Sequence, residues 1–278
     1  MRKVYLDHAA TTSVDREVLE KMLPYFSDIF GNPNSLHFFG READKAVTSA
    51  RDTMVRLLGC KPNELYFTSG GTEADNWAIK GIYAAYKHKG NHIITTRIEH
   101  KAVLASCKRL EKDGAEITYL DVDKYGTVNL EQLKSSITDK TILVSVMTAN
   151  NEVGTIQPIA EIGRICKERG VFFHTDAVQA IGAVDIDVKR DNIDLLSLSA
   201  HKFYGPKGIG ALYIRNGVKC DRYISGGSQE RGMRAGTTNV PLIVGMAAAF
   251  EKAILNREEN NKKLIQLPHE SFIRGLFC

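Results

Sequence analysis

Lys202 follows a buried strand, and its setting suggests covalent chemistry more strongly than that of any other residue. An apolar run from Ile193 to Leu198 predicts the strand, and His201 and Lys202 lie in the polar turn after it. A lysine in a partly dry pocket has its ammonium form disfavoured, so its neutral amine can attack an aldehyde to form a Schiff base. Taken alone, the pattern also fits a surface lysine at the exit of a strand.

Two further polar groups follow strands nearer the start of the chain. Gly70, Gly71 and Thr72 come after an apolar strand and open a helix. Glycines let the backbone approach a ligand closely, and a helix start offers unpaired N–H groups, so this turn suits a phosphate. A plain helix start capped by Thr72 fits as well. His100 follows the next strand, where it either stacks on a planar aromatic ligand or simply begins a helix.

The remaining strand ends carry amides and a carboxylate. Asn150 and Asn151 follow one apolar strand, where a simple turn is the alternative, and Asp176 follows another, where the alternative is a helix cap. A buried carboxylate is costly without a cationic partner, which a protonated ring nitrogen would supply. Since parallel sheets bind ligands at the carboxyl ends of their strands, these groups together predict a pyridoxal phosphate site.

Alternating strands and helices must position these side chains. Apolar runs predict strands over residues 64–68, 92–96, 116–122, 141–147, 171–175, 193–198 and 208–215. Helical spacing predicts helices over residues 43–58, 72–88, 101–112, 158–169 and 240–256. This alternation predicts an α/β fold with a mostly parallel sheet and helices on both faces.

The composition is that of an ordinary globular protein. Of 278 residues, 43% are hydrophobic and 25% charged, and the net charge is +4. That small excess does not favour nucleic acid or a membrane surface as partner, and the N-terminus lacks the apolar core of a signal peptide. We therefore expect a cytoplasmic protein with no metal site, whose five scattered cysteines are reduced thiols: Cys60, Cys107, Cys166, Cys220 and Cys278.

Several motifs together resemble the cysteine desulfurase family of the NifS/IscS type, within the fold-type-I pyridoxal-phosphate enzymes. The resemblance covers Met1 to about Lys263. The stretches that carry it lie at residues 5–12, 31–37, 68–76, 99–100, 150–154, 174–179, 199–202, 205–208 and 226–237. It implies that the chain is the large domain of such an enzyme.

The resemblance implies a role for each residue around the cofactor ring. Lys202 would form the Schiff base and later move protons at the substrate, and Asp176 would pair with the pyridinium nitrogen. His100 would stack on the ring, Gln179 would hydrogen-bond the ring hydroxyl, and Asn151 would lie beside ring and substrate.

A second set of residues would hold the phosphate. The resemblance assigns this role to Gly71, Thr72, Ser199 and His201, and it implies that Thr237 reaches the phosphate of the neighbouring subunit in a homodimer.

The resemblance also predicts a division of the chain into domains. Residues 1–15 would belong to the small domain, residues 16–258 would form the large cofactor-binding domain, and residues 259–278 would be a tail unlike the family. Most of the small domain, with its nucleophilic cysteine and its substrate-binding arginine, would then be missing. Cys278 lacks the surroundings of an activated thiol, and apolar surface that the small domain covers would be bare.

The predicted function is therefore that of a pyridoxal-phosphate-dependent cysteine desulfurase. It would convert L-cysteine to L-alanine and pass the sulfur to an acceptor or scaffold protein for iron–sulfur cluster assembly or another pathway, with the sulfur step impaired. Two alternatives remain open at this point: a related amino-acid lyase or aminotransferase, and a non-catalytic remnant or dimerisation partner.

Overall fold

A seven-stranded sheet forms the centre of the molecule. The computed structural model describes residues 3–266, and within them the strands lie in the order β1-β7-β6-β5-β4-β2-β3. Their bounds are β1 (Leu65–Thr68), β2 (His92–Thr96), β3 (Glu116–Leu120), β4 (Thr141–Ser145), β5 (Phe172–Asp176), β6 (Leu195–Ser199) and β7 (Gly210–Ile214). Of these seven strands, β7 alone runs opposite to the common direction of the other six. The predicted mostly parallel sheet is confirmed.

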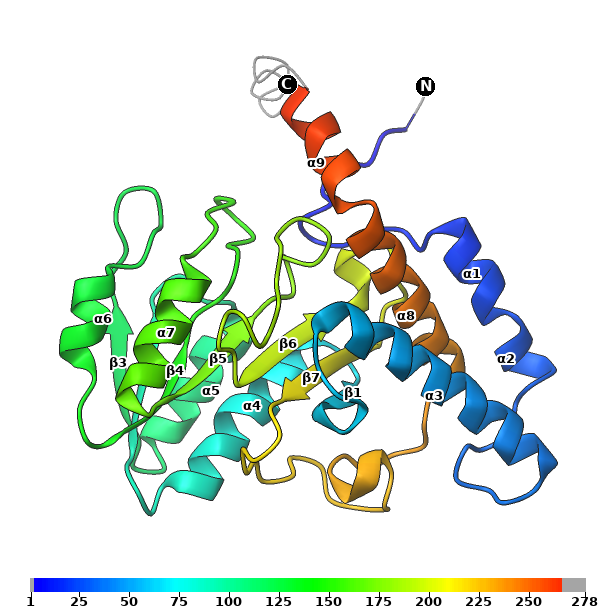
Figure 1. Ribbon diagram of the computed structural model, residues 1–278, viewed down its shortest axis with the longest axis horizontal. Helices are drawn as coiled ribbons and strands as arrows, with labels where there is room; N and C mark the ends of the chain where they lie inside the picture. Colours follow the sequence, from blue (N-terminus) through cyan, green and yellow to red (C-terminus); the bar gives the residue numbers. More distant parts are fainter. Residues whose placement is uncertain (1–2, 267–278) are drawn as a thin grey trace.

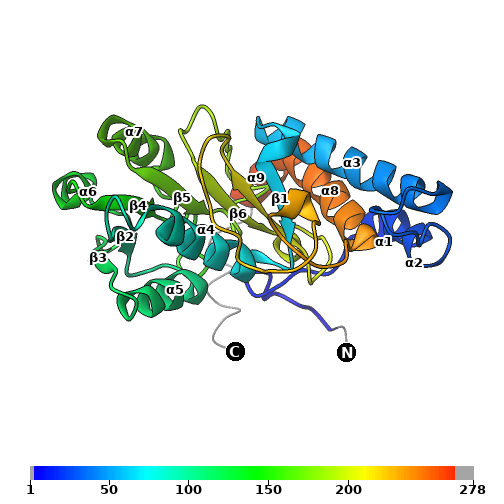
Figure 2. The ribbon, with the colours of Figure 1, turned by 90° about the horizontal axis from the view of Figure 1, so that it is seen from below.

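Helices cover both faces of the sheet, as the alternation predicted. Their bounds are α1 (Arg16–Met22), α2 (Pro24–Ser27), α3 (Phe38–Leu58), α4 (Gly71–Tyr86), α5 (Lys101–Glu111), α6 (Leu130–Ser136), α7 (Ile159–Arg169), α8 (Val240–Leu255) and α9 (Arg257–Gln266). Figures 1 and 2 show α4 and α5 on one face and α3, α7 and α8 on the other. Single 3₁₀ turns lie at Pro62–Glu64, Ala200–Lys202 and Glu230–Gly232.

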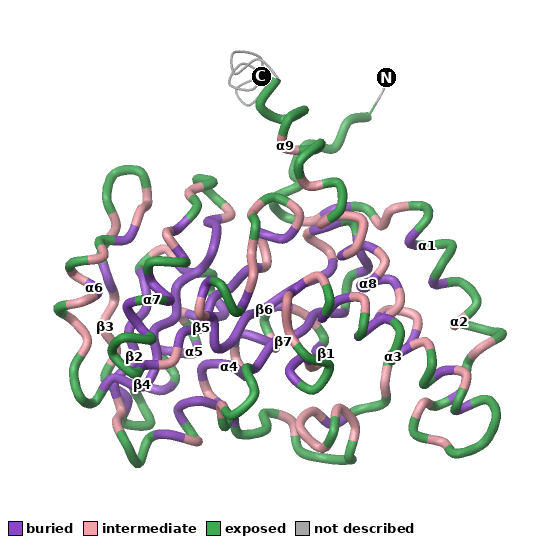
Figure 3. The backbone as a smooth tube through the Cα atoms, in the orientation of Figure 1, coloured by how far each residue is buried: buried purple, intermediate pink, exposed green. Residues whose placement is uncertain are grey.

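The two hydrophobic cores follow from the alternation of side chains along each strand. Successive strand residues point to opposite faces, so Ile93 packs with α4 and α5 while Ile94 packs with the opposite core. Every residue of β2, β4, β6 and β7 is buried. Figure 3 shows this buried centre in purple, whereas α9 has no buried residue.

Several helices differ from the sequence-based expectation. The helix expected over residues 43–58 begins at Phe38, with His37 as its N-cap. The long C-terminal helix ends at Leu255 and, after Asn256, a separate exposed helix begins. The short helices α1 and α6 were not predicted, although Asp15 and Asn129 cap them by accepting hydrogen bonds from backbone N–H groups. No described helix combines the length and apolar character that a bilayer crossing requires.

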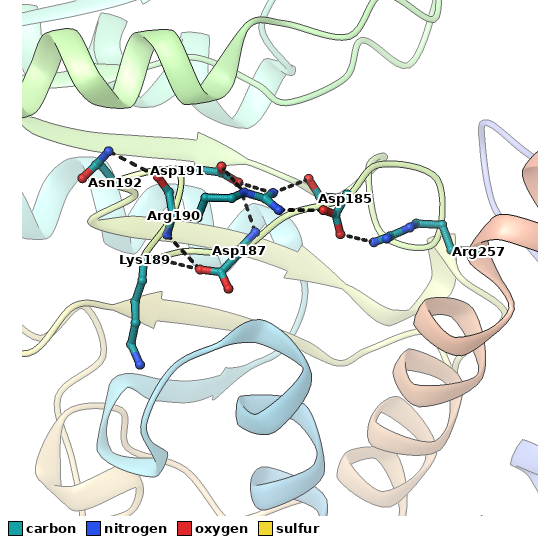
Figure 4. Close-up of polar contacts among 7 residues, drawn as sticks. All are labelled: Asp185, Asp187, Lys189, Arg190, Asp191, Asn192 and Arg257. Carbon is teal, nitrogen blue, oxygen red and sulfur yellow. Dashed lines mark hydrogen bonds and ion pairs between the residues drawn. The ribbon is translucent and has the colours of Figure 1, made fainter.

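A polar loop joins β5, which ends at Asp176, to β6, which is followed by the turn that holds Lys202. Arg190 bridges Asp185 and Asp191 at 2.7 and 2.8 Å, and Asp185 also pairs with Arg257 of α9 at 2.6 Å (Figure 4). Asp187 accepts two backbone hydrogen bonds and closes the turn. Each exposed ion pair of this kind contributes little to stability. Together they hold the backbone of the loop between β5 and β6 in place.

Replacement of Gly163 by alanine tests how closely α7 packs on this loop. A Cβ atom at Gly163 would overlap the carbonyl oxygen of Asp191, so the gain in helix propensity, about 1 kcal/mol, should be outweighed by overpacking. We expect Gly163→Ala to lower the free energy of unfolding by about 1–3 kcal/mol in denaturant titrations. Glu161→Ala, at an exposed position of the same helix, is the control. A gain in stability for Gly163→Ala would contradict this packing.

Candidate active site

A cavity of about 840 Å³ lies where the parallel strands end. The strands β1, β2, β4, β5 and β6 share one direction, so the residues that follow them meet at one edge of the sheet. The structure brings together nine of the ten residues singled out from the sequence: Gly71, Thr72, His100, Asn151, Asp176, Gln179, Ser199, His201 and Lys202 all line this cavity.

The start of α4 presents backbone N–H groups to the cavity. Its N-cap is Gly70, at φ +154°, which has no side chain with which to cap the helix; Thr72 is not the cap. Gly71 is buried, and a Cβ atom there would lie 2.7 Å from Cγ2 of Val178. The first turn of this 16-residue helix therefore offers N–H donors and a positive dipole end beside Ser199, which is the environment an anion requires.

Lys202 stands in the 3₁₀ turn that follows β6. Burial lowers the pKa of its ammonium group, although Asp176 and Asp7 act in the opposite direction. Its Nζ atom donates to the carbonyl oxygen of Ala10 at 3.1 Å and also to that of Ala9. The lowered pKa increases the fraction of neutral amine, the form that reacts with a carbonyl group.

Asp176 closes β5 and faces the cavity with an exposed fraction of 5%. Its Oδ1 accepts a hydrogen bond from the backbone N–H of Val178 at 2.9 Å. Burial raises the pKa of this carboxyl, and the Val178 N–H, His100 and Lys202 counteract the shift only in part. Asp176 is thus a carboxylate that a cation in the cavity would stabilise further.

His100 caps α5 and lines the cavity at the same time. Its Nδ1 accepts a hydrogen bond from the backbone N–H of Ala102 at 3.2 Å, so in the neutral ring the proton lies on Nε2. The two roles left open by the sequence are therefore compatible: the cap orients the ring, and the ring forms part of the cavity wall.

The N-terminal segment lies across the mouth of the cavity. Gln179 donates from Nε2 to the carbonyl oxygen of Ala9 at 2.9 Å, and His201 Nδ1 lies 3.0 Å from the Thr11 hydroxyl. Thr12 anchors the segment, since its N–H and hydroxyl both donate to the carbonyl oxygen of His201 at 2.9 Å. Sequence reasoning did not find Ala9 and Ala10, because their contribution is made by backbone carbonyls that carry no side-chain signal.

Asn151 lines the cavity, but its neighbour Asn150 builds the turn. Asn150 donates to the carbonyl oxygen of Ile98 at 3.0 Å and accepts from the N–H groups of Glu152 and Val153 at 2.9 Å each. The turn that the sequence left as an alternative is therefore present, and it places Asn151 at the cavity wall.

Thr237 is the one predicted site residue that lies apart from this cavity. It is exposed and lines smaller hollows near Asn32 and Ser69. Two ion pairs hold its loop, Arg51–Glu230 at 2.7 Å to α3 and Arg234–Glu73 at 2.8 Å to α4. Thr237 thus lies on an exposed loop, apart from the cavity of its own chain.

The four described cysteines lie outside the cavity lining. Cys107, Cys166 and Cys220 are buried and Cys60 is half-buried. Burial raises the pKa of all four thiols, that of Cys60 and of Cys107 to about 12. These four are therefore packed thiols, whereas Cys278 lies outside the described residues.

Two buried carboxyls next to the site went unnoticed in the sequence. Asp75 lines the floor of the cavity, and Glu99 accepts hydrogen bonds from the Thr96 hydroxyl at 2.8 Å and the Met147 N–H at 2.9 Å. Glu99 is 5% exposed, and burial raises its pKa to about 8. In the sequence, both carboxyls lie inside motifs in which other residues carry the recognisable chemistry, and this position was their only signal.

Comparison with known proteins gives consistent matches over nearly the whole chain. The aminotransferase class-V family model matches residues 4–271. A cysteine desulfurase IscS from Clostridium botulinum is 60% identical over 99% of this chain and 69% of its own length, and one from Methanosarcina thermophila is 58% identical over 99% and 68%. A solved NifS-like protein has a TM-score of 0.96 and 45% identity, covering 99% of this chain and 76% of its own. The match continues past Lys263, where we expected the resemblance to end.

Replacement of Glu99 by glutamine tests the neutral state of this carboxyl. The folded chain holds the Glu99 proton up to about pH 8, whereas the unfolded chain releases it near pH 4. Folding stability is therefore lost as pH rises through this window, by about 1.4 kcal/mol per pH unit. We expect the free energy of unfolding of Glu99→Gln, measured in urea, to rise relative to that of the wild type by this amount per pH unit between about pH 5 and pH 8. A pH-independent difference would contradict the assignment; Glu161→Gln is the exposed control.

Proposed function

Because this chain belongs to the cysteine desulfurases of the aminotransferase class-V family, we propose that it binds pyridoxal 5′-phosphate in the cavity at the carboxyl edge of the sheet and acts there on L-cysteine. The observation that carries the proposal is the meeting of Lys202 and Asp176 in one cavity, each with a pKa displaced by burial. A reactive amine and a carboxylate without a full cationic partner are the two groups that this cofactor needs.

The residues present fit the cofactor at each of its polar ends. The buried carboxylate of Asp176 suits a protonated ring nitrogen, and the start of α4, with the missing side chain of Gly71, suits the phosphate. His100 lines the wall on which a flat ring can stack. When bound, the cofactor supplies an electron sink for the bonds around the substrate α-carbon.

The side chains of this chain would then divide the work. Asp176 would keep the ring nitrogen protonated, because a carboxylate in a dry site stabilises a neighbouring cation. Lys202 Nζ would hold the cofactor and would move protons at the substrate. Gln179 and Asn151 lie where they can orient ring and substrate, and Ser199 and His201 where they can hold the phosphate.

Sulfur transfer needs a thiolate that the four described cysteines do not provide. Their thiols are packed away from the cavity with raised pKa values, and the thiolate is the form that attacks sulfur. We propose that residues 16–258 form the cofactor-binding domain, that Thr237 completes the phosphate site of a second copy, and that the acceptor thiol comes from outside the described part of the chain.

Lys202→Ala tests the cofactor assignment. The purified chain titrated with pyridoxal 5′-phosphate should develop the visible absorption of a lysine-bound cofactor, and Lys202→Ala should lose that absorption while remaining folded. Lys263→Ala, an exposed lysine on α9, should titrate like the wild type. A band that survives in Lys202→Ala would show that another amine is used.

Sulfur release tests the second part of the proposal. With cofactor and with L-cysteine at low concentration as the sole thiol, we expect at least about tenfold less sulfide than with an added thiol reductant, because no described thiolate can accept the sulfur. Cys60→Ser, the least buried of the four, should leave the rate unchanged. Sulfide production without an added thiol that Cys60→Ser abolishes would refute the proposal.

A further inference from the structure

Asp75 is a carboxyl group placed in the dry floor of the cavity. It lies on α4 in the first turns after Gly71, faces the sheet, and has an exposed fraction of 1%. Neither of its oxygens accepts a hydrogen bond from an N–H or O–H group in good geometry within the described residues. A carboxylate left in this state would be among the costliest groups in the protein.

The nearest titratable neighbour of Asp75 is Asp176. Oxygen atoms of the two carboxyls and a ring nitrogen of His100 all lie within 4.8 Å of one another. Burial, and then the charge of Asp176, raise the pKa of Asp75. Two like charges this close in a dry site cannot both be ionised at low cost.

His174 does not supply the missing positive charge. Its Nε2 lies 3.7 Å from Asp75 Oδ1, but the ring is held between the hydroxyls of Ser145 at 2.8 Å and Ser197 at 3.0 Å. A hydroxyl can donate or accept, so both ring nitrogens are satisfied in neutral imidazole. Burial lowers the pKa of His174 to about 3.

The two carboxyls differ in how well each stabilises a negative charge. Asp176 accepts the Val178 N–H and is favoured as an anion by His100 and Lys202. Only the Ser197 hydroxyl favours the Asp75 anion, and burial and the charges of Asp176 and Glu99 act against it. A proton that belongs to the pair is therefore expected on Asp75.

We propose that Asp75 is held in the folded chain as a neutral carboxylic acid that donates a hydrogen bond to Asp176, and that it is the positioning residue that keeps the negative charge of the pair on Asp176. The consequence of this proton for the cofactor rests on the proposed function. The charge of Asp176 would then face the ring nitrogen, and Asp75 would use the remaining hydrogen-bonding capacity of Asp176.

Other charged groups around Asp75 leave this assignment intact. The strands β4, β6 and β7, which pack on α4, carry no Asp, Glu, Lys, Arg or His. Besides Asp176 and His174 of β5, the titratable groups are Glu99 and His100 between β2 and α5, and Lys202 after β6. On α4 itself, Glu73 is paired with Arg234.

The first test locates the proton in the cofactor-free chain. Infrared spectra at about pH 7 should show absorption from protonated carboxyl groups, one part of which is lost in Asp75→Asn and a separate part in Glu99→Gln, the matched buried carboxyl. Loss of signal in Glu99→Gln but not in Asp75→Asn would overturn the proposal.

The second test measures the linkage between this proton and folding. Since unfolded Asp releases its proton near pH 4, the folding equilibrium constant of Asp75→Asn should rise relative to the wild type by about tenfold per pH unit above that value. A ratio that does not change with pH would mean that Asp75 holds no extra proton. Neither of these tests involves the cofactor, so they separate a failure of this inference from a failure of the proposed function.

The third test asks whether the donor matters to the cofactor. The amide of Asp75→Asn can still donate to Asp176, so its dissociation constant for pyridoxal 5′-phosphate should stay within about threefold of the wild type, whereas Asp75→Leu, of similar volume, should bind about tenfold or more weakly. Equal losses in both variants would overturn the positioning role. If Asp75→Leu does not fold, a loss of more than tenfold in Asp75→Asn overturns it alone.

Discussion

The shared direction of β1, β2, β4, β5 and β6 is the constraint on which the site depends. The strand β7 lies between β1 and β6 and is antiparallel to both, so β1 runs parallel to β6. Without this arrangement the start of α4 would leave the opposite edge of the sheet. Because the strand ends converge, a glycine turn, a histidine, an amide, a carboxylate and a lysine surround one volume.

That convergence concentrates poorly solvated carboxyls in one place. Asp75, Glu99 and Asp176 are each at most 5% exposed, and burial raises the pKa of all three. In most core positions such groups would be replaced by apolar residues, so the two flanking hydrophobic cores must offset their cost. Binding of a ligand whose cation meets Asp176 would return part of this free energy and stabilise the folded chain.

The sequence predicted the strands that carry the site because continuous apolar runs mark buried parallel strands, and nine of its ten site residues line the cavity. It did not predict the neutral acids, since the state of Asp75 or Glu99 depends on which residues surround it in the folded chain. Thr237, expected at the phosphate of a neighbouring subunit, lies apart from the cavity of its own chain, on a loop whose ion pairs Arg51–Glu230 and Arg234–Glu73 join segments far apart in the sequence. The helices α1 and α6 are too short for a clear periodic signal.

The contacts between Lys202 and the N-terminal segment are separate from the contacts that anchor this segment. Lys202 donates to carbonyl oxygens of Ala9 and Ala10, which are exposed, whereas Thr12 is buried and bound to His201 and Tyr204. The anchor at Thr12 is therefore independent of the lysine contacts. A carbonyl ligand that takes up the amine of Lys202 would therefore compete with the outer carbonyl contacts and not with the anchor at Thr12.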